Sequence, residues 1–355
     1  MRRSTICVLF SGIMGACGST PAPQTGGESS GLRSGQPEGD AGPDEAISKA
    51  SEDTSTSIRE GTVSYMAGGT IFQLDVRDGA KPVNLSLKLN ALAMGQDDYL
   101  AVSRNGEFLT ISTTRFTPEC SEWACLAIVS DQGSKADSVL LKGVPVRPSG
   151  HAAVSNDGNR LVFAGGDGPH AQDLFLLERN GEEWVGPRLI TEVSPHNYNT
   201  APVLNSDGTR VLFDCGPVPY GQAGTGICEI LVEGLLLTQV VDSSQHPDGK
   251  EGEFLAHHGD YLPDGAIVFE ADWNGSQLWT VREGDEKPIR LNSEFSNDNM
   301  PCVLPGGYIA SLWLERPGAV GASELKIAQS DGKKFVVLTP NLDVASLSCH
   351  ATVSP

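Results

Sequence analysis

A short phrase recurs along the 355-residue chain, an Asp-Gly or Asn-Gly turn set between two alternating apolar runs. The copies read AVSRNGEFLTI, HAAVSNDGNRLVF, APVLNSDGTRVLF and YLPDGAIVF, with a degenerate copy, CVLPGGYIASLW. Each phrase predicts a β-hairpin, because Asn, Asp and Gly tolerate the positive φ angles of a tight turn. The turns lie at residues 105, 157, 207, 264 and 306, in steps of 52, 50, 57 and 42. A strand-only repeat of this length is typical of the four-stranded blade of a β-propeller.

The repeat predicts an all-β fold of six four-stranded antiparallel blades, with seven blades as the nearest alternative. Residues 61–355 are 295 residues, or about 49 for each of six blades. Blades two to six are expected at residues 97–142, 151–191, 200–241, 254–292 and 299–339. The strands of blade two are expected at DDYLAVS, EFLTIST, CLAIVSD and SVLLKG, and no blade requires a helix.

The two ends of residues 61–355 fit together as one blade. The C-terminal CHATVSP matches the beginning of HAAVSND, and residues 61–89 (GTVSYMAGG, TIFQLDV and KPVNLSLKL) supply three further strands. We therefore expect the C-terminal strand to join the N-terminal blade as its inner strand. Such closure removes the exposed edge that an open ring of sheets would have.

The first 16 residues are expected to be a lipoprotein signal peptide. Two arginines precede a short apolar stretch, and MGAC resembles the bacterial lipobox, in which the thiol of the cysteine, here Cys17, is lipidated. Ordinary secretion with cleavage near Ala16 is the alternative. The apolar stretch is too short to span a bilayer as a helix. Gly18 after the lipidated cysteine favours the outer membrane or cell surface under the enterobacterial sorting rule.

Residues 17–60 are expected to be a disordered tether. They are rich in Gly, Ser, Pro and acidic residues and offer almost nothing apolar to bury, so folding would not offset the loss of chain entropy. The formal net charge of the whole chain is −20. That charge disfavours nucleic acid as a partner and disfavours contact of a folded domain with anionic lipid. We therefore expect membrane contact only through the lipid anchor.

The phrase S-x-D-G followed by an apolar strand resembles the repeat of the TolB-like periplasmic propellers, over residues 61–355. The resemblance implies architecture rather than activity, because many unrelated functions share such a scaffold. The Gly-His and Trp-Asp signatures of WD repeats are absent. The sequence before residue 61 does not predict the α/β domain that precedes the propeller in TolB itself. Roles that TolB fills through that domain are therefore not carried over.

The six cysteines beyond Cys7 and Cys17 are even in number, which in an exported chain favours disulfides. Two pairs, Cys120–Cys125 and Cys215–Cys228, would each staple the loop of one hairpin. Cys302 and Cys349 fall on the inner strands of blades six and one, so a third bridge would lock the seam of the ring. The alternative is free, buried and inert cysteine.

Aligning the six inner strands on their turns gives candidate residues for the channel mouth. In blade order, these are His350, Tyr99, His151, Ala201, His258 and Met300. Histidines on alternate blades would form a triangle, and three converging imidazoles suit a divalent metal. The arrangement resembles that of periplasmic propeller lyases acting on acidic sugars, which hold a divalent metal with histidines at the channel mouth. The alternative is imidazoles bonded to backbone without metal, and the neighbouring His257 and Asp260 could add a ligand or an acceptor.

The sequence favours a non-enzymatic protein- or ligand-binding module of the cell envelope, because no nucleophile-and-base motif accompanies the repeat. The partner would be an envelope protein or peptide, or a glycan stacked on Trp273. The channel-mouth binding residues would be Tyr99, His151, His258 and His350, with no cofactor expected beyond a divalent metal. The alternative function is a metal-dependent carbohydrate lyase or hydrolase that uses His151, His258 and His350 as ligands.

Overall fold

The computed structural model describes residues 61–77, 79–122, 124–219, 221–244, 246–250, 252–291, 297–313, 324–329, 335–340 and 344–351. The chain divides into two units, Met1–Ser55 and Thr56–Pro355. The expected signal peptide, the lipidation site at Cys17 and the expected tether lie outside the described residues. Within the described part, no helix is long and apolar enough to cross a membrane.

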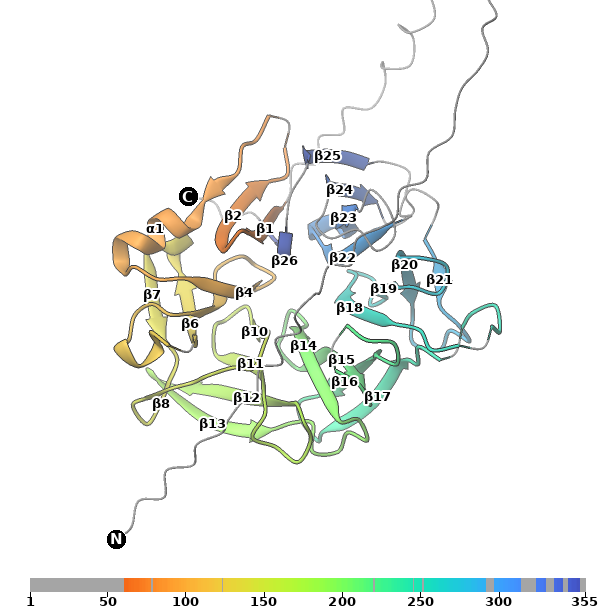
Figure 1. Cartoon of the computed structure of the whole chain (residues 1–355), viewed down its shortest axis with the longest axis horizontal. Helices are drawn as coiled ribbons and strands as arrows, with labels where there is room; N and C mark the ends of the chain where they lie inside the picture. Colours follow the sequence, from red (N-terminus) through yellow and green to blue (C-terminus); the bar gives the residue numbers. More distant parts are fainter. Residues whose placement is uncertain are drawn as a thin grey trace, which may run out of the picture. The chain divides into compact units, whose positions relative to one another are not determined.

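Six antiparallel sheets of four strands each are arranged as a ring (Figure 1), which confirms the predicted six-bladed propeller. Blade one consists of β26 (Val344–His350), β1 (Thr62–Ala67), β2 (Thr70–Asp75) and β3 (Val83–Asn84). Blade two consists of β4 (Asp97–Val102), β5 (Leu109–Thr113), β6 (Cys125–Ser130) and β7 (Lys135–Ser138). Blade three consists of β10 (Ala152–Val154), β11 (Arg160–Gly165), β12 (Asp173–Asn180) and β13 (Glu183–Leu189).

The remaining blades follow the same pattern, each from one continuous stretch of chain. Blade four consists of β14 (Tyr198–Leu204), β15 (Arg210–Gly216), β16 (Gly226–Leu231) and β17 (Leu236–Val241). Blade five consists of β18 (Ala256–Tyr261), β19 (Ile267–Ala271), β20 (Gln277–Val281) and β21 (Ile289–Arg290). Blade six consists of β22 (Asp298–Val303), β23 (Tyr308–Trp313), β24 (Glu324–Gln329) and β25 (Phe335–Pro340). Short 3₁₀ turns lie at Pro118–Cys120, Asp131–Gly133 and Pro305–Gly307.

The ring closes as predicted. Strand β26 pairs antiparallel with β1, with His350 opposite Thr62 and Cys349 opposite Val63, so blade one contains both ends of the propeller. The described residues form six hydrophobic clusters, and each cluster joins two neighbouring blades, including blades six and one. Because a blade buries its faces only against its neighbours, closing the last joint completes the core.

The predicted turn chemistry is confirmed in each repeat. The turn glycines 106, 158, 208, 265 and 306 all have φ between 68° and 84°, a region that favours glycine. At Gly158 a second constraint applies, because an added Cβ would lie 2.6 Å from the ring of Phe108 in the preceding blade. The Asp157 carboxylate accepts hydrogen bonds from the Ser155 hydroxyl and the Asn159 amide, and so fixes the turn locally.

All three predicted disulfides are present. Cys120–Cys125 and Cys215–Cys228 span 5 and 13 residues, and Cys302–Cys349 spans 47. The third bridge joins β22 of blade six to β26 of blade one, where the ring closes. It therefore fastens the seam, as expected from the positions of the two cysteines.

One expected strand is a helix instead. KPVNLSLKL was expected as a strand, but only Val83 and Asn84 are extended, and α1 covers Leu85–Leu92. The Asn84 side chain caps this helix by accepting from the Leu87 amide. Leu and Lys are strong helix formers and the segment has no β-branched residue after Val83, so the apparent alternation was misleading. The helix buries Leu85 and Leu89 and leaves Leu87 and Leu92 exposed.

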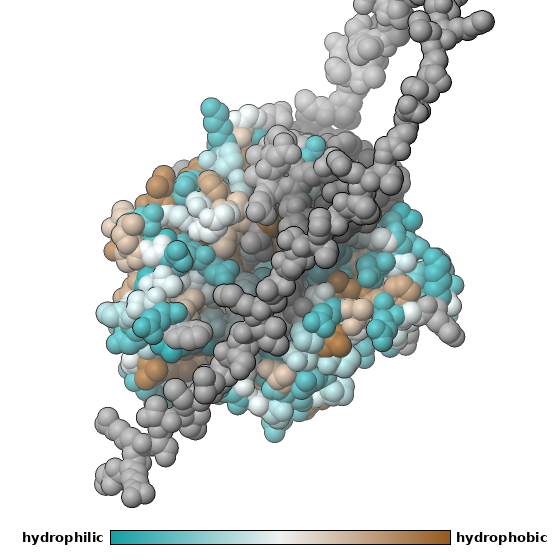
Figure 2. Space-filling model, in the orientation of Figure 1, coloured by the Kyte–Doolittle hydropathy of each residue, from teal (hydrophilic) through white to brown (hydrophobic). Residues whose placement is uncertain are grey.

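The fourth strand of blade two also differs from the expectation. SVLLKG was expected to form it, but β7 ends at Ser138 and the following leucines form β8 (Leu140–Leu141), paired with β9 (Val144–Pro145). Gly143, with a φ of 79°, makes the tight turn of this extra hairpin. Exposed hydrophobic residues on α1 and β8–β9 are visible as brown patches at that edge of the propeller in Figure 2.

Candidate functional site

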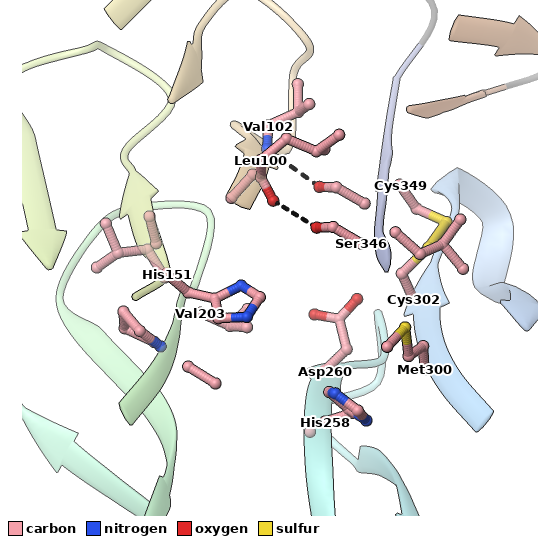
Figure 3. Close-up of a pocket in the computed structure, with 18 of the residues that line it drawn as sticks. Leu100, Val102, His151, Val203, His258, Asp260, Met300, Cys302, Ser346 and Cys349 are labelled. Carbon is pink, nitrogen blue, oxygen red and sulfur yellow. Dashed lines mark hydrogen bonds between the residues drawn. A yellow bond between two sulfur atoms is a disulfide. The ribbon is translucent and has the colours of Figure 1, made fainter. Parts of the chain in front are cut away.

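The channel of the propeller contains a cavity of about 110 Å³, walled by the inner strands (Figure 3). Most of its lining is aliphatic, with His151, His258, Arg104 and Asp260 as the ionisable side chains among the lining residues. Two hydrogen bonds in the cavity wall join the inner strands of blades one and two. The Val102 amide donates to Ser348 Oγ. Ser346 Oγ donates to the Leu100 carbonyl. The cavity is therefore a small, preformed and mainly apolar hollow.

The residues aligned on the turns share an unusual backbone in four blades. Tyr99, Ala201, His258 and Met300 have φ between 45° and 55°, and the register of each inner strand shifts at that point. These are β-bulges, which insert an extra residue and redirect its side chain. Blades one and three have no such bulge at His350 and His151. The alignment therefore found equivalent positions, but the backbone differs between blades.

Carboxylates bind the amides of three of the bulged residues. Asp214, on β15 of blade four, accepts from the His258 amide at 3.1 Å, and Glu270, on β19 of blade five, accepts from the Met300 amide at 3.2 Å. Asp98 accepts from the amide of Tyr99 at 3.0 Å. Because a bulge removes the residue from the regular ladder, these carboxylates support the backbone that forms the channel wall.

The structure brings two of the three predicted histidines to the cavity. His151 and His258 both line it, and the Tyr99 ring lies against the His151 ring with centroids 4.7 Å apart. Burial lowers the pKa of His151 to about 4, with a further contribution from His258. Burial likewise lowers the pKa of His258 to about 4, and here the neighbouring His257 contributes. Both rings are therefore neutral at ordinary pH.

His350 lies elsewhere. Its Nε2 is 3.0 Å from Ser64 Oγ and its Nδ1 is 2.8 Å from the carbonyl of Ala351, so the ring is held within blade one. It is 3% exposed and does not line the cavity. His151, His258 and His350 do not converge as metal-ligand atoms in the described structure. The sequence analysis gave two alternatives for these histidines, a metal site or imidazoles bonded to the backbone. His350 has the second arrangement, through the carbonyl of Ala351.

A different group converges on the wall of blade five. His257 Nε2 and His258 Nδ1 each lie 3.2 Å from Glu270 Oε2, and the two rings are 3.9 Å apart between centroids. All three side chains are nearly buried. Ser276 Oγ donates to Glu270 Oε1 at 2.7 Å, which fixes the carboxylate. This group contains two imidazole nitrogens and one carboxylate oxygen, a donor set that could hold a metal ion.

The charges in this group depend on one another. Burial acts against the ionised form of Glu270, but His257 and His258 outweigh burial and hold the pKa of Glu270 below its usual range. Burial also acts to lower the pKa of His257, but Glu270 and Asp214 outweigh it, so that pKa is raised. The buried Asp214 has a pKa raised to about 7, an effect of burial that His257 partly opposes. Glu270 and Asp214 therefore both favour the protonated, positively charged form of His257.

An ion pair separates the cavity from a second hollow near the turns. Arg104 of blade two reaches Asp260 of blade five, and the side chains are 18% and 8% exposed. Asp260 also accepts from the amide of Val303 in blade six, so three blades meet at this carboxylate. Arg104 lines both the central cavity and the second hollow of about 620 Å³. The ion pair therefore forms the wall between the two.

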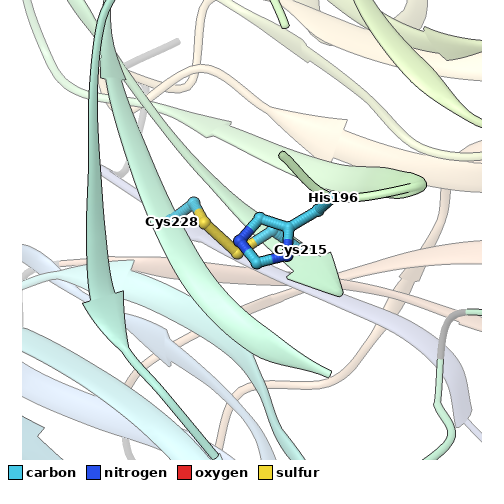
Figure 4. A group of neighbouring side chains, drawn as sticks. All are labelled: His196, Cys215 and Cys228. Carbon is cyan, nitrogen blue, oxygen red and sulfur yellow. A yellow bond between two sulfur atoms is a disulfide. The ribbon is translucent and has the colours of Figure 1, made fainter. Parts of the chain in front are cut away.

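Two other candidates are less suited to a ligand. Trp273 is 3% exposed, donates Nε1–H to the Ser243 carbonyl and packs edge-on against Trp279, so it offers no free face for a sugar. His196 lies beside Cys215 and Cys228 (Figure 4). The two sulfurs are bonded to each other in the disulfide, which leaves no thiolate to bind a metal.

The sequence analysis did not identify Glu270 or Arg104 as candidate site residues. Counting outward from the turn at Asp264 places Glu270 opposite His258 in an unbroken register, and the bulge then makes His257 its partner in the β18–β19 pairing. The hairpin pattern therefore held enough information to find the carboxylate. Nothing in the local sequence signals that Arg104 reaches Asp260, because that contact crosses the channel between two blades.

Comparison with known proteins defines the fold. No protein-family model matches the sequence, and no curated protein matches it. Among solved structures, TolB from Acinetobacter baumannii is 11% identical with a TM-score of 0.58, over 81% of this chain and 66% of that one. A candidate TolB from Agrobacterium tumefaciens is 13% identical with a TM-score of 0.51, over 83% and 99%. A puromycin-hydrolysing peptidase from Mycobacterium tuberculosis is 12% identical with a TM-score of 0.50, over 78% and 41%.

At these identities the comparisons bear on architecture alone, and they agree with the six-bladed ring observed in this chain. One similar structure is a peptidase, so the fold by itself does not determine whether a chain is an enzyme. The chain is a six-bladed β-propeller with the TolB-like fold.

Proposed function

We propose that the protein is a non-enzymatic binding module of a bacterial cell envelope, whose channel accepts an apolar side chain of a partner protein or peptide. The observation that carries this proposal is the preformed aliphatic cavity inside a closed ring. A volume of about 110 Å³ is well below the roughly 300–1,000 Å³ of pockets for small molecules and cofactors. Such a hollow suits one anchoring side chain better than a sugar ring or a cofactor.

The direction of entry follows from the Arg104–Asp260 ion pair. The ion pair closes the end of the cavity that lies near the turns. Tyr99 lies toward the other end of the inner strand of blade two and is 39% exposed. The partner would therefore approach from the side of Tyr99 and His151. Loops on a rigid propeller are well placed to form such an interface.

Site-specific photo-cross-linking in living bacteria tests the proposal. A benzophenone amino acid would replace Tyr99 at the mouth or, as a control, Leu236, which is 67% exposed on the outer strand β17. We expect a discrete cross-linked product from position 99 and none from position 236. A Val203→Phe change, which fills the cavity, should abolish the product while the circular dichroism spectrum stays native. Equal products from both positions would contradict the proposal.

The envelope location is proposed from the N-terminal sequence, in which MGAC precedes the Gly/Ser/Pro-rich segment. Metabolic labelling with an alkyne fatty acid should mark the wild type and not Cys17→Ser. Fractionation of the labelled protein then distinguishes the outer from the inner membrane. Labelling that persists in Cys17→Ser would overturn the anchor.

The alternative of a metal-dependent carbohydrate lyase or hydrolase has lost the triangular ligand set that motivated it, since His350 is bonded within blade one. It is tested directly by incubating the purified protein with acidic and neutral oligosaccharides, with and without Mn²⁺, and following unsaturated and reducing ends. Turnover that depends on the metal would replace the proposal of a non-enzymatic module.

A further inference from the structure

We propose that His257, His258 and Glu270 form a binding site for a divalent transition-metal ion, for which Zn²⁺ is the best match. The ligand atoms would be His257 Nε2, His258 Nδ1 and Glu270 Oε2. The site goes beyond the proposed function, because it does not depend on whether a partner enters the cavity. It also differs from the triangle of histidines predicted by the alignment, with which it shares only His258.

The backbone explains how two consecutive residues face one ion. In a regular strand, neighbouring side chains point to opposite faces of the sheet. The bulge at His258, where φ is 55°, breaks that alternation and brings both rings to Glu270, with centroids 3.9 Å apart. The amide of the bulged residue is held by Asp214, so this geometry is part of the fold.

The distances fit a metal site. Ligands 2.0–2.1 Å from a tetrahedral zinc ion are separated from one another by about 3.4 Å. Both nitrogen-to-oxygen distances in this group are 3.2 Å, and all three ligand atoms lie within 4.8 Å of one another. For N–H···O hydrogen bonds, 3.2 Å is at the long end of the usual range. Shifts of a few tenths of an ångström would therefore accommodate an ion.

The surroundings orient the carboxylate. Ser276 Oγ donates to Glu270 Oε1 and the Met300 amide donates to Oε2, while β19 pairs with β18 so that Glu270 faces His257. Such supporting hydrogen bonds are typical of ligating carboxylates. Two imidazoles and one carboxylate with a fourth position for water are the donor set of many zinc sites, whereas Mg²⁺ and Ca²⁺ prefer oxygen ligands.

The proposed metal site adjoins the central cavity, so a bound ion would change the charge of the cavity wall. His258 is both a proposed ligand and a residue of the cavity wall, and Figure 3 shows it near Met300 and Asp260. An ion held there would place a positive charge beside an otherwise mostly apolar hollow. The competing explanation is that the two histidines and Glu270 only hydrogen-bond to support the bulge of Met300, in which case no ion binds.

Calorimetric titration of the untagged, chelator-treated full chain with ZnCl₂ decides between these explanations. We expect one equivalent to bind, and Co²⁺ to give absorption between about 500 and 700 nm, which is typical of tetrahedral coordination. His257→Ala and Glu270→Gln should each weaken Zn²⁺ binding at least about 100-fold. Even residues that only hydrogen-bond to a metal ligand typically change metal affinity about 10–100-fold when they are replaced. Ser276→Ala, which only frees the carboxylate, should weaken it about 10-fold.

Matched controls separate this site from the alternatives. His151→Ala, in the same cavity, His350→Ala, in blade one, and His196→Ala, beside the disulfide, should leave the stoichiometry and the Co²⁺ spectrum unchanged. Circular dichroism and thermal melts show that each variant is folded. A wild type that binds no Zn²⁺, or binding that survives Glu270→Gln and His257→Ala together, would overturn the proposal. Neither result bears on the cross-linking at Tyr99.

Discussion

Blades one and five carry a histidine at the same aligned position of the inner strand, yet the two side chains lie in different environments. His258 sits in a bulge, lines the cavity and contacts Glu270, whereas His350 lies in an unbroken stretch of pairing and bonds to Ser64. Blade five is one continuous segment, but blade one is assembled from both ends of the propeller. Equivalent sequence positions therefore acquire different roles when the local backbone or the origin of the strand differs.

The largest effect is expected from breaking blade one at its seam. Replacing Cys302 and Cys349 by serine removes a bridge that closes 47 residues, worth about 4 kcal/mol in the chain-entropy model. The matched control, Cys215→Ser with Cys228→Ser, opens only 13 residues and should cost about 3 kcal/mol. Urea denaturation measures both. A smaller loss at the seam than at the control would show that blade one is held mainly by its strand pairing.

A second prediction extends the comparison to blade six, whose inner strand is bulged like that of blade five. Burial raises the pKa of Asp298 to about 6, although Lys326 opposes the change. Between about pH 4 and 6 the folded state then holds a proton that the unfolded chain has lost, so stability falls as pH rises. Asp298→Asn removes this dependence, and its stability relative to the wild type should rise by up to about 3 kcal/mol across that range.

Denaturation at a series of pH values tests this sign. Asp207→Asn serves as a control, because hydrogen bonds from Thr209 keep the pKa of Asp207 below its ordinary value. Its carboxylate is ionised above pH 5 in both states, so the difference from wild type should stay flat above that pH. A wild type whose stability rises, relative to Asp298→Asn, over the same range would contradict the assignment.

A third prediction concerns the ion pair beside the bulge of blade five. Asp260→Ala leaves Arg104 and the Val303 amide without their carboxylate and should cost about 2 kcal/mol, less than a fully buried pair because Arg104 is 18% exposed. It should also join the cavity to the hollow near the turns. Thermal denaturation checks the first effect, and a crystal structure of the variant checks the second. An unchanged melting temperature would mean that the pair is incidental.

The smallest effect is expected in blade one. Ser64→Ala removes the hydroxyl that faces His350 Nε2, at a cost of about 1 kcal/mol, and should leave Zn²⁺ binding unchanged. Denaturation and the calorimetric titration give the two readouts. A change in Zn²⁺ affinity would show that His350 communicates with blade five, and the contrast between the two histidines would fail.

Most of the fold could be predicted because its signals are local. The turn glycines, the spacing of the repeats and the match between CHATVSP and HAAVSND depend on short stretches, and the cysteine positions followed once the strands were placed. The helix at Leu85 and the hairpin at Leu140 were missed, because alternating leucines fit a strand as well as other structures. Capping by Asn84 was the available signal for the helix.

Less of the site could be predicted, for a physical reason. An alignment on turns assigns residues to positions along a strand, but a bulge changes where a side chain points without changing its position in the sequence. The imidazole of His350 and that of His258 are indistinguishable in the alignment. What separates them is Ser64, contributed by a strand at the other end of the chain, and Glu270, contributed across a hairpin.

The pairing of β26 with β1 has a consequence for how the protein is made. Ser64 and His350 are 286 residues apart, so an emerging chain exposes the edge of β1 long before its partner is available. At about 5–20 residues per second, synthesis alone imposes a wait of roughly 15 to 60 s. An unpaired strand edge invites aggregation during that time. Shielding of the β1 edge until the last strand arrives would therefore favour folding over aggregation.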